Sequence, residues 1–230
     1  MIVACHQPNY LPHLGFFHKM KQADVFVILD TVQFSDGVYQ HRNRIRTDTG
    51  WKWLTIPVDR TFQPIQNVKI KNDVRLSGRP WQTYHWDSIQ NSYAKTPYFE
   101  KFAPALAALY QRPYENLADA TIDIITHLKN VAGIATPLIR ASTLNIDASD
   151  ASLRLAKLTE VAGGTVYLTG SSGGTTYELR EKPFEERGIS IMRHEFSHPV
   201  YDQYHARRDN SFEKNLAAID ALFNTGTLLL

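Results

Sequence analysis

The stretch IVACHQPNYLPHLGFFHK, residues 2–19, decides the predicted fold. It opens with a short apolar run, which is typical of a buried strand. Polar side chains follow at once, and Pro12 then stands where a first helical turn can begin, because proline tolerates that position. A second apolar run, residues 25–29, starts soon after this helix and ends at Asp30. The stretch therefore predicts a strand–helix–strand unit whose polar cluster lies where open parallel sheets bind ligands.

The rest of the chain continues this alternation of strands and helices. Further expected strands are residues 137–141, 165–169 and 188–193. We predict an α/β fold with a largely parallel, Rossmann-like sheet flanked by helices. Segments 51–58 and 66–70 have strand patterns with no helix between them, and they predict a small antiparallel insertion. We expect one α/β domain over residues 1–230, with a mostly helical block inserted at about 75–135.

Composition limits the class of protein. At 230 residues, with 43% hydrophobic and 21% charged residues, the chain can bury a full core. A formal net charge of +2 is too small to indicate broad nucleic-acid binding. Cys5 is the single cysteine, which excludes an internal disulfide framework. No secretory signal is visible and no apolar run reaches the roughly 18 residues of a membrane span. We therefore expect a cytoplasmic protein with no membrane partner.

The opening stretch supplies the first candidate site. His6 or His18 is expected to act as a base, because imidazole titrates near neutral pH. Asp30 would fix the tautomer of a histidine or hold an ammonium group. The substrate-binding candidates around these three residues are Gln7, Asn9, Tyr10 and Gln33.

A row of arginines forms a second candidate site. Arg42, Arg44 and Arg46 alternate, so in a strand they point to one face. Such a row can clamp a phosphate or carboxylate, or it can be the solvated face of an edge strand. The Trp-Lys-Trp segment at 51–53 adds a stacking surface for a sugar, a base or a tRNA end. We assign Arg42, Asn43 and Arg44 to substrate binding.

A glycine-rich loop, residues 170–174, follows a predicted strand and precedes a predicted helix. Backbone N–H groups at such a turn can hold an anion or an oxyanion, and the helix dipole helps them. A turn without a ligand fits the pattern equally well. Ser171 and Ser172 are the candidates for lining an oxyanion site.

Residues 194–198 read HEFSH and match the H-E-x-x-H pattern of zinc proteases. That pattern requires a helix, whereas Pro199 disfavours the helical conformation at His198. A strand would place His194 and His198 about 13 Å apart. We therefore predict no metal site, and we assign His198 and Tyr201 to substrate binding.

Residues 13–16, His-Leu-Gly-Phe, partly match the His-x-Gly-His motif of nucleotidyl-transferring enzymes. In those enzymes the imidazoles stabilise charge on phosphates in the transition state. Phe16 replaces the second histidine here, and His18 follows two positions later. Nucleotidyl transfer is therefore an alternative function for this stretch.

Several blocks of the sequence together resemble the WbqC-like protein family, and the resemblance covers essentially the whole chain. The blocks are HQPNYLP (6–12), LGFFHK (14–19), ADVFVILD (23–30), VQFS (32–35), RNRI (42–45), WKWLTIPV (51–58) and HPVYDQ (198–203), with a similar pattern over 215–226. The family occurs in bacterial O-antigen and other surface-polysaccharide clusters, and the resemblance implies a glycine or aminoacyl transferase acting on amino sugars. Two departures are His13, where the family usually has Trp, and the loop at 169–174, where the family has a Ser-Gly-Pro-containing loop. If this loop holds the acyl donor, the donor differs here.

The residues and the resemblance together predict a transferase that moves an acyl or aminoacyl (glycyl-like) group to an amine, on an amino sugar in surface-polysaccharide biosynthesis. The expected partner is a small-molecule or nucleotide-linked substrate, or an aminoacyl-tRNA, and no cofactor is evident. A nucleotidyltransferase or adenylating enzyme is one alternative. A non-catalytic module that binds sugars or tRNA is the other. The sequence leaves the donor, the acceptor and the oligomeric state open.

Overall fold

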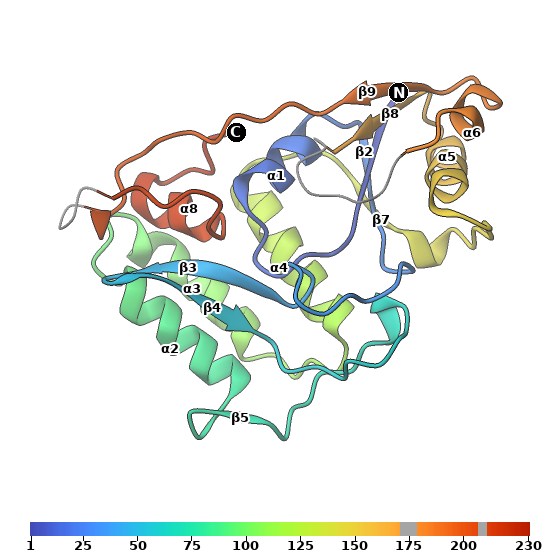
Figure 1. Cartoon of the computed structure of the whole chain (residues 1–230). Coiled ribbons are helices and arrows are strands. Elements are labelled where there is room, and N and C mark those ends of the chain that lie inside the picture. Colours follow the sequence, from blue (N-terminus) through green and yellow to red (C-terminus); the bar gives the residue numbers. More distant parts are fainter. Residues whose placement is uncertain (171–178, 207–210) are drawn as a thin grey trace. The chain divides into compact units, whose positions relative to one another are not determined.

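The chain folds into two compact units, each assembled from several separate segments (Figure 1). The computed structural model describes residues 1–170, 179–206 and 211–230. Unit 1 comprises residues 1–7, 18–32 and 134–197, and unit 2 comprises residues 8–17, 33–133 and 198–230. The chain changes unit after residues 7, 17, 32, 133 and 197, so neither unit is a continuous stretch.

A five-stranded sheet in the order β7-β2-β1-β8-β9 forms the centre of unit 1, and every neighbouring pair is parallel (Figure 1). Its strands are β1 (Ile2–His6), β2 (Val25–Ile28), β7 (Leu138–Arg140), β8 (Val166–Thr169) and β9 (Ser190–Arg193). The four residues of β2 are all buried, as a strand covered on both faces requires. The predicted α/β fold with a largely parallel sheet is confirmed.

One face of this sheet packs against two helices that lie between its strands in sequence, α5 (Ala151–Val161) and α6 (Lys182–Glu185). Alternate residues such as Val3, Cys5 and Tyr167 share this core, because side chains of a strand point to opposite faces in turn. Asp150 is the N-cap of α5 and accepts a hydrogen bond from the backbone N–H of Leu153 at 3.0 Å.

Unit 2 combines an antiparallel hairpin with helices. The hairpin pairs β3 (Arg42–Thr47) with β4 (Gly50–Thr55), and the helices are α2 (Trp81–Tyr93), α3 (Phe99–Tyr110), α4 (Leu117–Val131) and α8 (Ile219–Thr225). Short elements complete it, namely η1 (Ile65–Asn67), β5 (Arg75–Leu76) and β6 (Arg79–Pro80). The short helix η2 (Ala141–Thr143) belongs to unit 1, and so do the residues of α1 (Leu14–Lys21) from His18 onward.

The predicted antiparallel insertion is confirmed, but one of its predicted strands is wrong. The partner of β4 is β3, whereas segment 66–70 begins in the 3-10 turn η1 and makes only isolated bridges, Val58 with Ile70 and Lys69 with Asn116. Ile65 and Val68 are both buried, and residues three apart lie on one side of a 3-10 turn. The apolar spacing of this segment therefore fits a 3-10 turn followed by extended chain.

No helix in the described part of the chain is both long enough and apolar enough to span a membrane.

Candidate functional site

Polar side chains gather at the carboxyl edge of the parallel sheet in unit 1. His6 is the last residue of β1, Asp30 follows β2 by two residues, and His194 directly follows β9. The backbone N–H of Leu29 donates to the carbonyl of His6 at 2.8 Å, and that of His194 donates to the carbonyl of Thr169 at 3.1 Å. Because all five strands run in one direction, these residues share the edge where such sheets bind ligands.

The central feature of this edge is a pair of histidines. His18 Nδ1 lies 2.8 Å from His194 Nε2, although 176 residues separate them in sequence. His18 comes from the last turn of α1, while His194 is 5% exposed. The ring of Phe196 lies 5.1 Å from that of His18 and covers the pair on one side.

The electrostatic surroundings favour an uncharged His18. Burial, and secondly the charge of Lys21, lower the pKa of His18 from its ordinary value of 6.5. A neutral imidazole has one N–H, so one ring of the pair donates and the other accepts. When His18 donates from Nδ1, its Nε2 carries a lone pair that can take a proton. His194 then stabilises the resulting imidazolium by accepting from it, as an orienting partner does in a catalytic dyad.

His6 stands on the central strand of the same edge. Its Nδ1 lies 2.9 Å from the backbone carbonyl of Gln7, and a carbonyl only accepts, so in this contact Nδ1 carries the hydrogen. Gln7 belongs to unit 1 as well. The structure thus brings together in one unit both histidines that the sequence predicts as bases.

A buried lysine, which the sequence reasoning missed, lies next to His18 in sequence. Lys19 is 4% exposed, and its Nζ donates to the carbonyl of Cys5 at 2.9 Å. Burial lowers the pKa of Lys19 to about 8 and raises that of the Cys5 thiol to about 12. The thiol is therefore protonated and inert near neutral pH. The available signal was the position of Lys19 between the apolar residues of α1.

Asp30 lies at the predicted edge and is completely buried. Its Oδ2 accepts from Arg140 Nε at 2.7 Å and from Ser142 Oγ at 2.6 Å, while its Oδ1 accepts from the backbone N–H of Ser142 at 2.9 Å. These contacts join the end of β2 to the segment after β7. A further role in fixing a histidine tautomer or holding an ammonium group stays a prediction.

The candidates Asn9 and Tyr10 belong to unit 2, and both are buried. The hydroxyl of Tyr10 lies 2.8 Å from His85 Nδ1 and 2.6 Å from the hydroxyl of Tyr110. This hydrogen-bonded group ties the chain before α1 to helices α2 and α3. In the structure the Tyr10 side chain is thus internal to unit 2.

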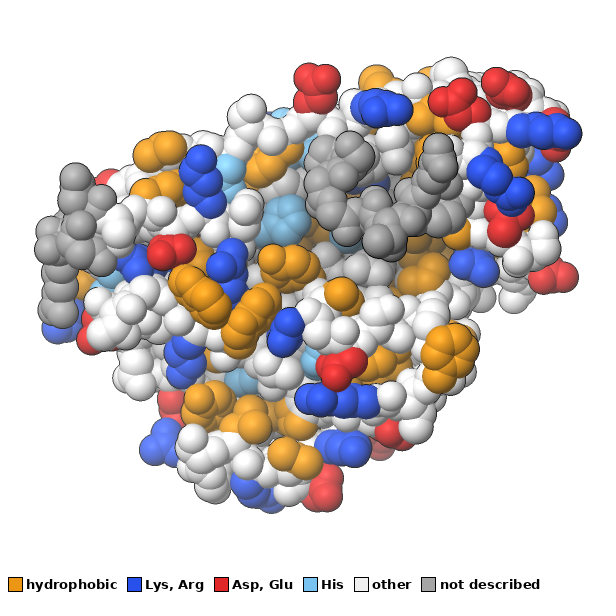
Figure 2. Space-filling view, in the orientation of Figure 1, with side chains coloured by type: hydrophobic (Ala, Val, Ile, Leu, Met, Phe, Trp, Pro, Cys, Tyr) orange, Lys and Arg blue, Asp and Glu red, His pale blue; other side chains and the backbone are white. Residues whose placement is uncertain are grey.

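The predicted arginine row lies on β3 in unit 2. Arg42 lies 4.3 Å from the centre of the Trp53 ring, and Arg44 lies 4.9 Å from that of Trp51. Figure 2 shows the resulting surface, with hydrophobic and basic side chains side by side over β3 and β4. Asn43 points to the opposite face, is fully buried and donates from Nδ2 to the carbonyl of Leu11 at 2.6 Å.

The candidates Gln33, His198 and Tyr201 also belong to unit 2. The Gln33 side chain donates from Nε2 to the carbonyl of Phe34 at 3.1 Å. His198 Nδ1 contacts the carbonyl of Pro199 at 2.8 Å, and the ring of His198 stacks near that of Tyr201 at 6.3 Å. Ser171 and Ser172 lie outside the described residues.

Residues 194–200 follow β9 and contain no helix, so the prediction that the H-E-x-x-H match is not helical is confirmed. In the structure His194 is instead the hydrogen-bond partner of His18. Sequence reasoning missed this role. The available signal was that His194, like His6, comes at the end of an apolar strand.

One of the comparisons with known proteins identifies a family. The chain is 28% identical over 228 residues to the uncharacterized protein Rv1507c of Mycobacterium tuberculosis (strain ATCC 25618 / H37Rv). The aligned region covers 97% of this chain and 94% of that protein. No solved structure matches the chain. The sequence model of the WbqC-like protein family matches residues 7–228, and the chain therefore belongs to the WbqC-like protein family.

Proposed function

We propose that the protein is a transferase that moves an acyl or aminoacyl group, glycyl-like in size, to the amine of an amino sugar, with His18 as the general base. The observation that carries this proposal is the hydrogen bond between His18 and His194 at the carboxyl edge of the sheet. The choice of an amino sugar rests on family membership and on the resemblance to proteins of surface-polysaccharide clusters.

The chemistry requires a neutral amine. The amine nitrogen attacks the carbonyl carbon of the donor with its lone pair, and His18 Nε2 takes the proton that this nitrogen loses as the new C–N bond forms. The bond from that carbon to the leaving group breaks, and the leaving group keeps the electron pair. The imidazolium of His18, which donates from Nδ1 to His194, returns its proton to the leaving group. A base with a lowered pKa is uncharged at neutral pH and is ready for the first step.

The experiment measures product formation by mass spectrometry with a nucleotide-linked amino hexose as acceptor. The donors are glycyl-tRNA, glycyl-coenzyme A, and glycine with ATP and magnesium. We expect His18→Gln to lower kcat by about 10²–10⁴-fold, as loss of a general base does. His194→Gln should reduce kcat less, because glutamine can still accept a hydrogen bond. His127→Gln in α4 is the matched control and should retain full activity.

The pH profile separates a base from a merely structural histidine. The acid limb of kcat/KM should fall below pH 6.5, because the pKa of His18 is lowered from that value. Full turnover by His18→Gln, or no glycyl product from any of the three donors, contradicts the proposal. Release of pyrophosphate without glycyl transfer would favour the alternative of nucleotidyl transfer.

A further inference from the structure

We infer that a pocket at the turn of the β3–β4 hairpin binds a nucleotide, with its base against Trp51 and its phosphate against lysines. The pocket has a volume of about 530 Å³ and lies between residues 47–52, the last turns of α2 and residues 204–205. This volume is within the range of small-molecule sites. All of its lining belongs to unit 2, whereas the histidine pair belongs to unit 1. The inference therefore does not depend on the proposed transferase activity.

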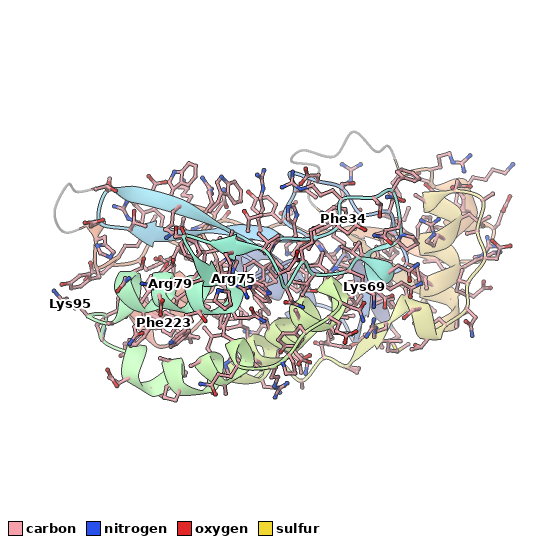
Figure 3. All side chains as sticks on the ribbon, turned by 90° about the horizontal axis from the view of Figure 1, so that it is seen from below. Phe34, Lys69, Arg75, Arg79, Lys95 and Phe223 are labelled. Carbon is pink, nitrogen blue, oxygen red and sulfur yellow. The ribbon has the colours of Figure 1, made fainter. Side chains whose placement is uncertain are left out.

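Two lysines give the pocket its positive charge. Lys52 Nζ donates to Ser88 Oγ at 2.8 Å and lies 4.8 Å from the centre of the Tyr84 ring. Lys95 follows α2, and Figure 3 shows its side chain extending outward at that end of the helix. Within the described residues neither ammonium group forms an ion pair, while Asp48 supplies one negative charge to the lining. Each ammonium has three donors, so hydrogen-bonding capacity is left for a phosphate.

A histidine in the wall of the pocket also supports a ligand site. His205 Nε2 lies 2.8 Å from the backbone carbonyl of Ser92, which can only accept, so Nε2 carries the hydrogen. The other nitrogen, Nδ1, is buried and has no hydrogen-bond partner among the described residues. A buried polar atom without a partner is costly. A ligand hydroxyl or N–H that reaches this nitrogen would satisfy it.

Trp51 distinguishes a nucleotide from simpler ligands. Its side chain is 42% exposed, which is unusual for an indole, and Arg44 lies over its ring at 4.9 Å. Exposed aromatic rings beside cations are stacking surfaces for bases. An inorganic anion would account for the lysines but not for Trp51, and a neutral sugar would account for Trp51 but not for the lysines. A nucleotide accounts for both, either free, as part of a nucleotide-linked molecule, or at the end of an RNA strand.

The test is isothermal titration calorimetry of the full chain with AMP, adenosine and inorganic phosphate. We expect AMP to bind more tightly than adenosine or phosphate alone. Trp51→Leu should weaken AMP binding by about tenfold, as loss of one base stack does. Lys95→Ala should weaken it by about tenfold through loss of a charged hydrogen bond. Trp51→Phe should retain most of the affinity because it keeps an aromatic face.

Lys101→Ala is the matched control, since Lys101 also lies over an aromatic ring, that of Phe102 at 4.9 Å, but does not line the pocket. Its affinity for AMP should equal that of the wild type, and melting curves should show that every variant is folded. The inference is overturned if AMP does not bind at roughly millimolar concentration, if phosphate binds as tightly as AMP, or if Trp51→Leu has no effect. A short oligoribonucleotide that binds more tightly than AMP would support the site and assign it to an RNA end, because each additional base adds stacking.

Discussion

Among the described residues each unit buries one aspartate completely, and the two units satisfy that carboxylate in different ways. In unit 1, Asp30 pairs with the guanidinium of Arg140, whose side chain is 36% exposed. In unit 2, Asp220 on α8 accepts from three neutral donors. These are the hydroxyls of Tyr93 (3.0 Å) and Tyr201 (2.7 Å) and the amide of Gln203 (2.8 Å).

The difference shows what each carboxylate does. The charge of Asp30 is balanced by a cation that reaches solvent, and Asp30 lies at the sheet edge that carries the candidate site. Asp220 has no such direct ion pair among the described residues, and its burial raises its pKa above the ordinary 3.8. It connects α8 to α2 and to the segment at 201–203. We therefore expect Asp220 to support the fold of unit 2, and Asp30 to matter for both stability and the site.

The largest effect should come from Asp220→Ala. This change leaves three donors without this acceptor, two of them on fully buried side chains, and opens a cavity, so the free energy of unfolding should fall by about 3–5 kcal/mol. Urea denaturation followed by tryptophan fluorescence measures it. Asp123→Ala is the control, because Asp123, like Asp220, accepts from a tyrosine, but it pairs in addition with an arginine and is 39% exposed. If Asp220→Ala lowers the free energy of unfolding no more than Asp123→Ala does, the expected role of Asp220 in the fold of unit 2 is wrong.

A smaller effect is expected for Asp30→Ala. The guanidinium of Arg140 can turn to water when its partner is lost, so the free energy of unfolding should fall by only about 1–3 kcal/mol. The same urea experiment measures it. In Asp30→Asn the amide oxygen can still accept from the backbone N–H of Ser142, and the loss should be smaller still. If Asp30→Ala costs more than Asp220→Ala, the distinction between the two aspartates is wrong.

The smallest effect is a pH dependence. Because the pKa of Asp220 is raised on folding, the folded state binds a proton that the unfolded state has already lost. Its contribution to stability is fully present below pH 3.8 and is lost as the pH rises through the folded pKa. The difference in unfolding free energy between wild type and Asp220→Asn should therefore change by up to about 1.4 kcal/mol per pH unit, in favour of wild type as the pH falls.

Urea denaturation of both proteins from acid to neutral pH checks this dependence. His13, His41 and His85 act in the opposite direction, because burial lowers their pKa values to about 4, about 4 and about 3. Below pH 6.5 the unfolded state binds protons that these folded imidazoles do not, so they lower stability in acid. They are common to both proteins and cancel in the difference. A difference that is constant with pH would show that the pKa of Asp220 is unchanged on folding.

Much of the fold could be predicted because local patterns determine it. The continuous apolar run of β2, for example, indicates a buried strand within a few residues. The segment at 66–70 was predicted wrongly because alternation over five residues also fits a 3-10 turn with extended chain. Pairing of β3 with β4 depends on contacts across the hairpin, which the arginine and tryptophan spacing only partly indicated.

The candidate site was predictable only in part. Position at a strand end was enough to single out His6 and Asp30, but nothing local pairs His18 with His194. That contact follows from the sheet order, which places β9 two strands from β1. The donors around Asp220 come from α2 and from residues 201–203, and an acid on a helix is ordinarily predicted to face solvent. These contacts depend on long-range topology, which local residue patterns do not indicate.

The interleaved path of the chain has a consequence for anyone who would divide the protein. A single break after residue 133 leaves β1 and β2 on the first fragment and their neighbours β8 and β7 on the second. Neither fragment contains the complete sheet, so each would expose unpaired strand edges, which promote aggregation until the other fragment binds. The two fragments would therefore have to be co-expressed so that they can associate. Recovery of soluble protein would then indicate that both units had folded.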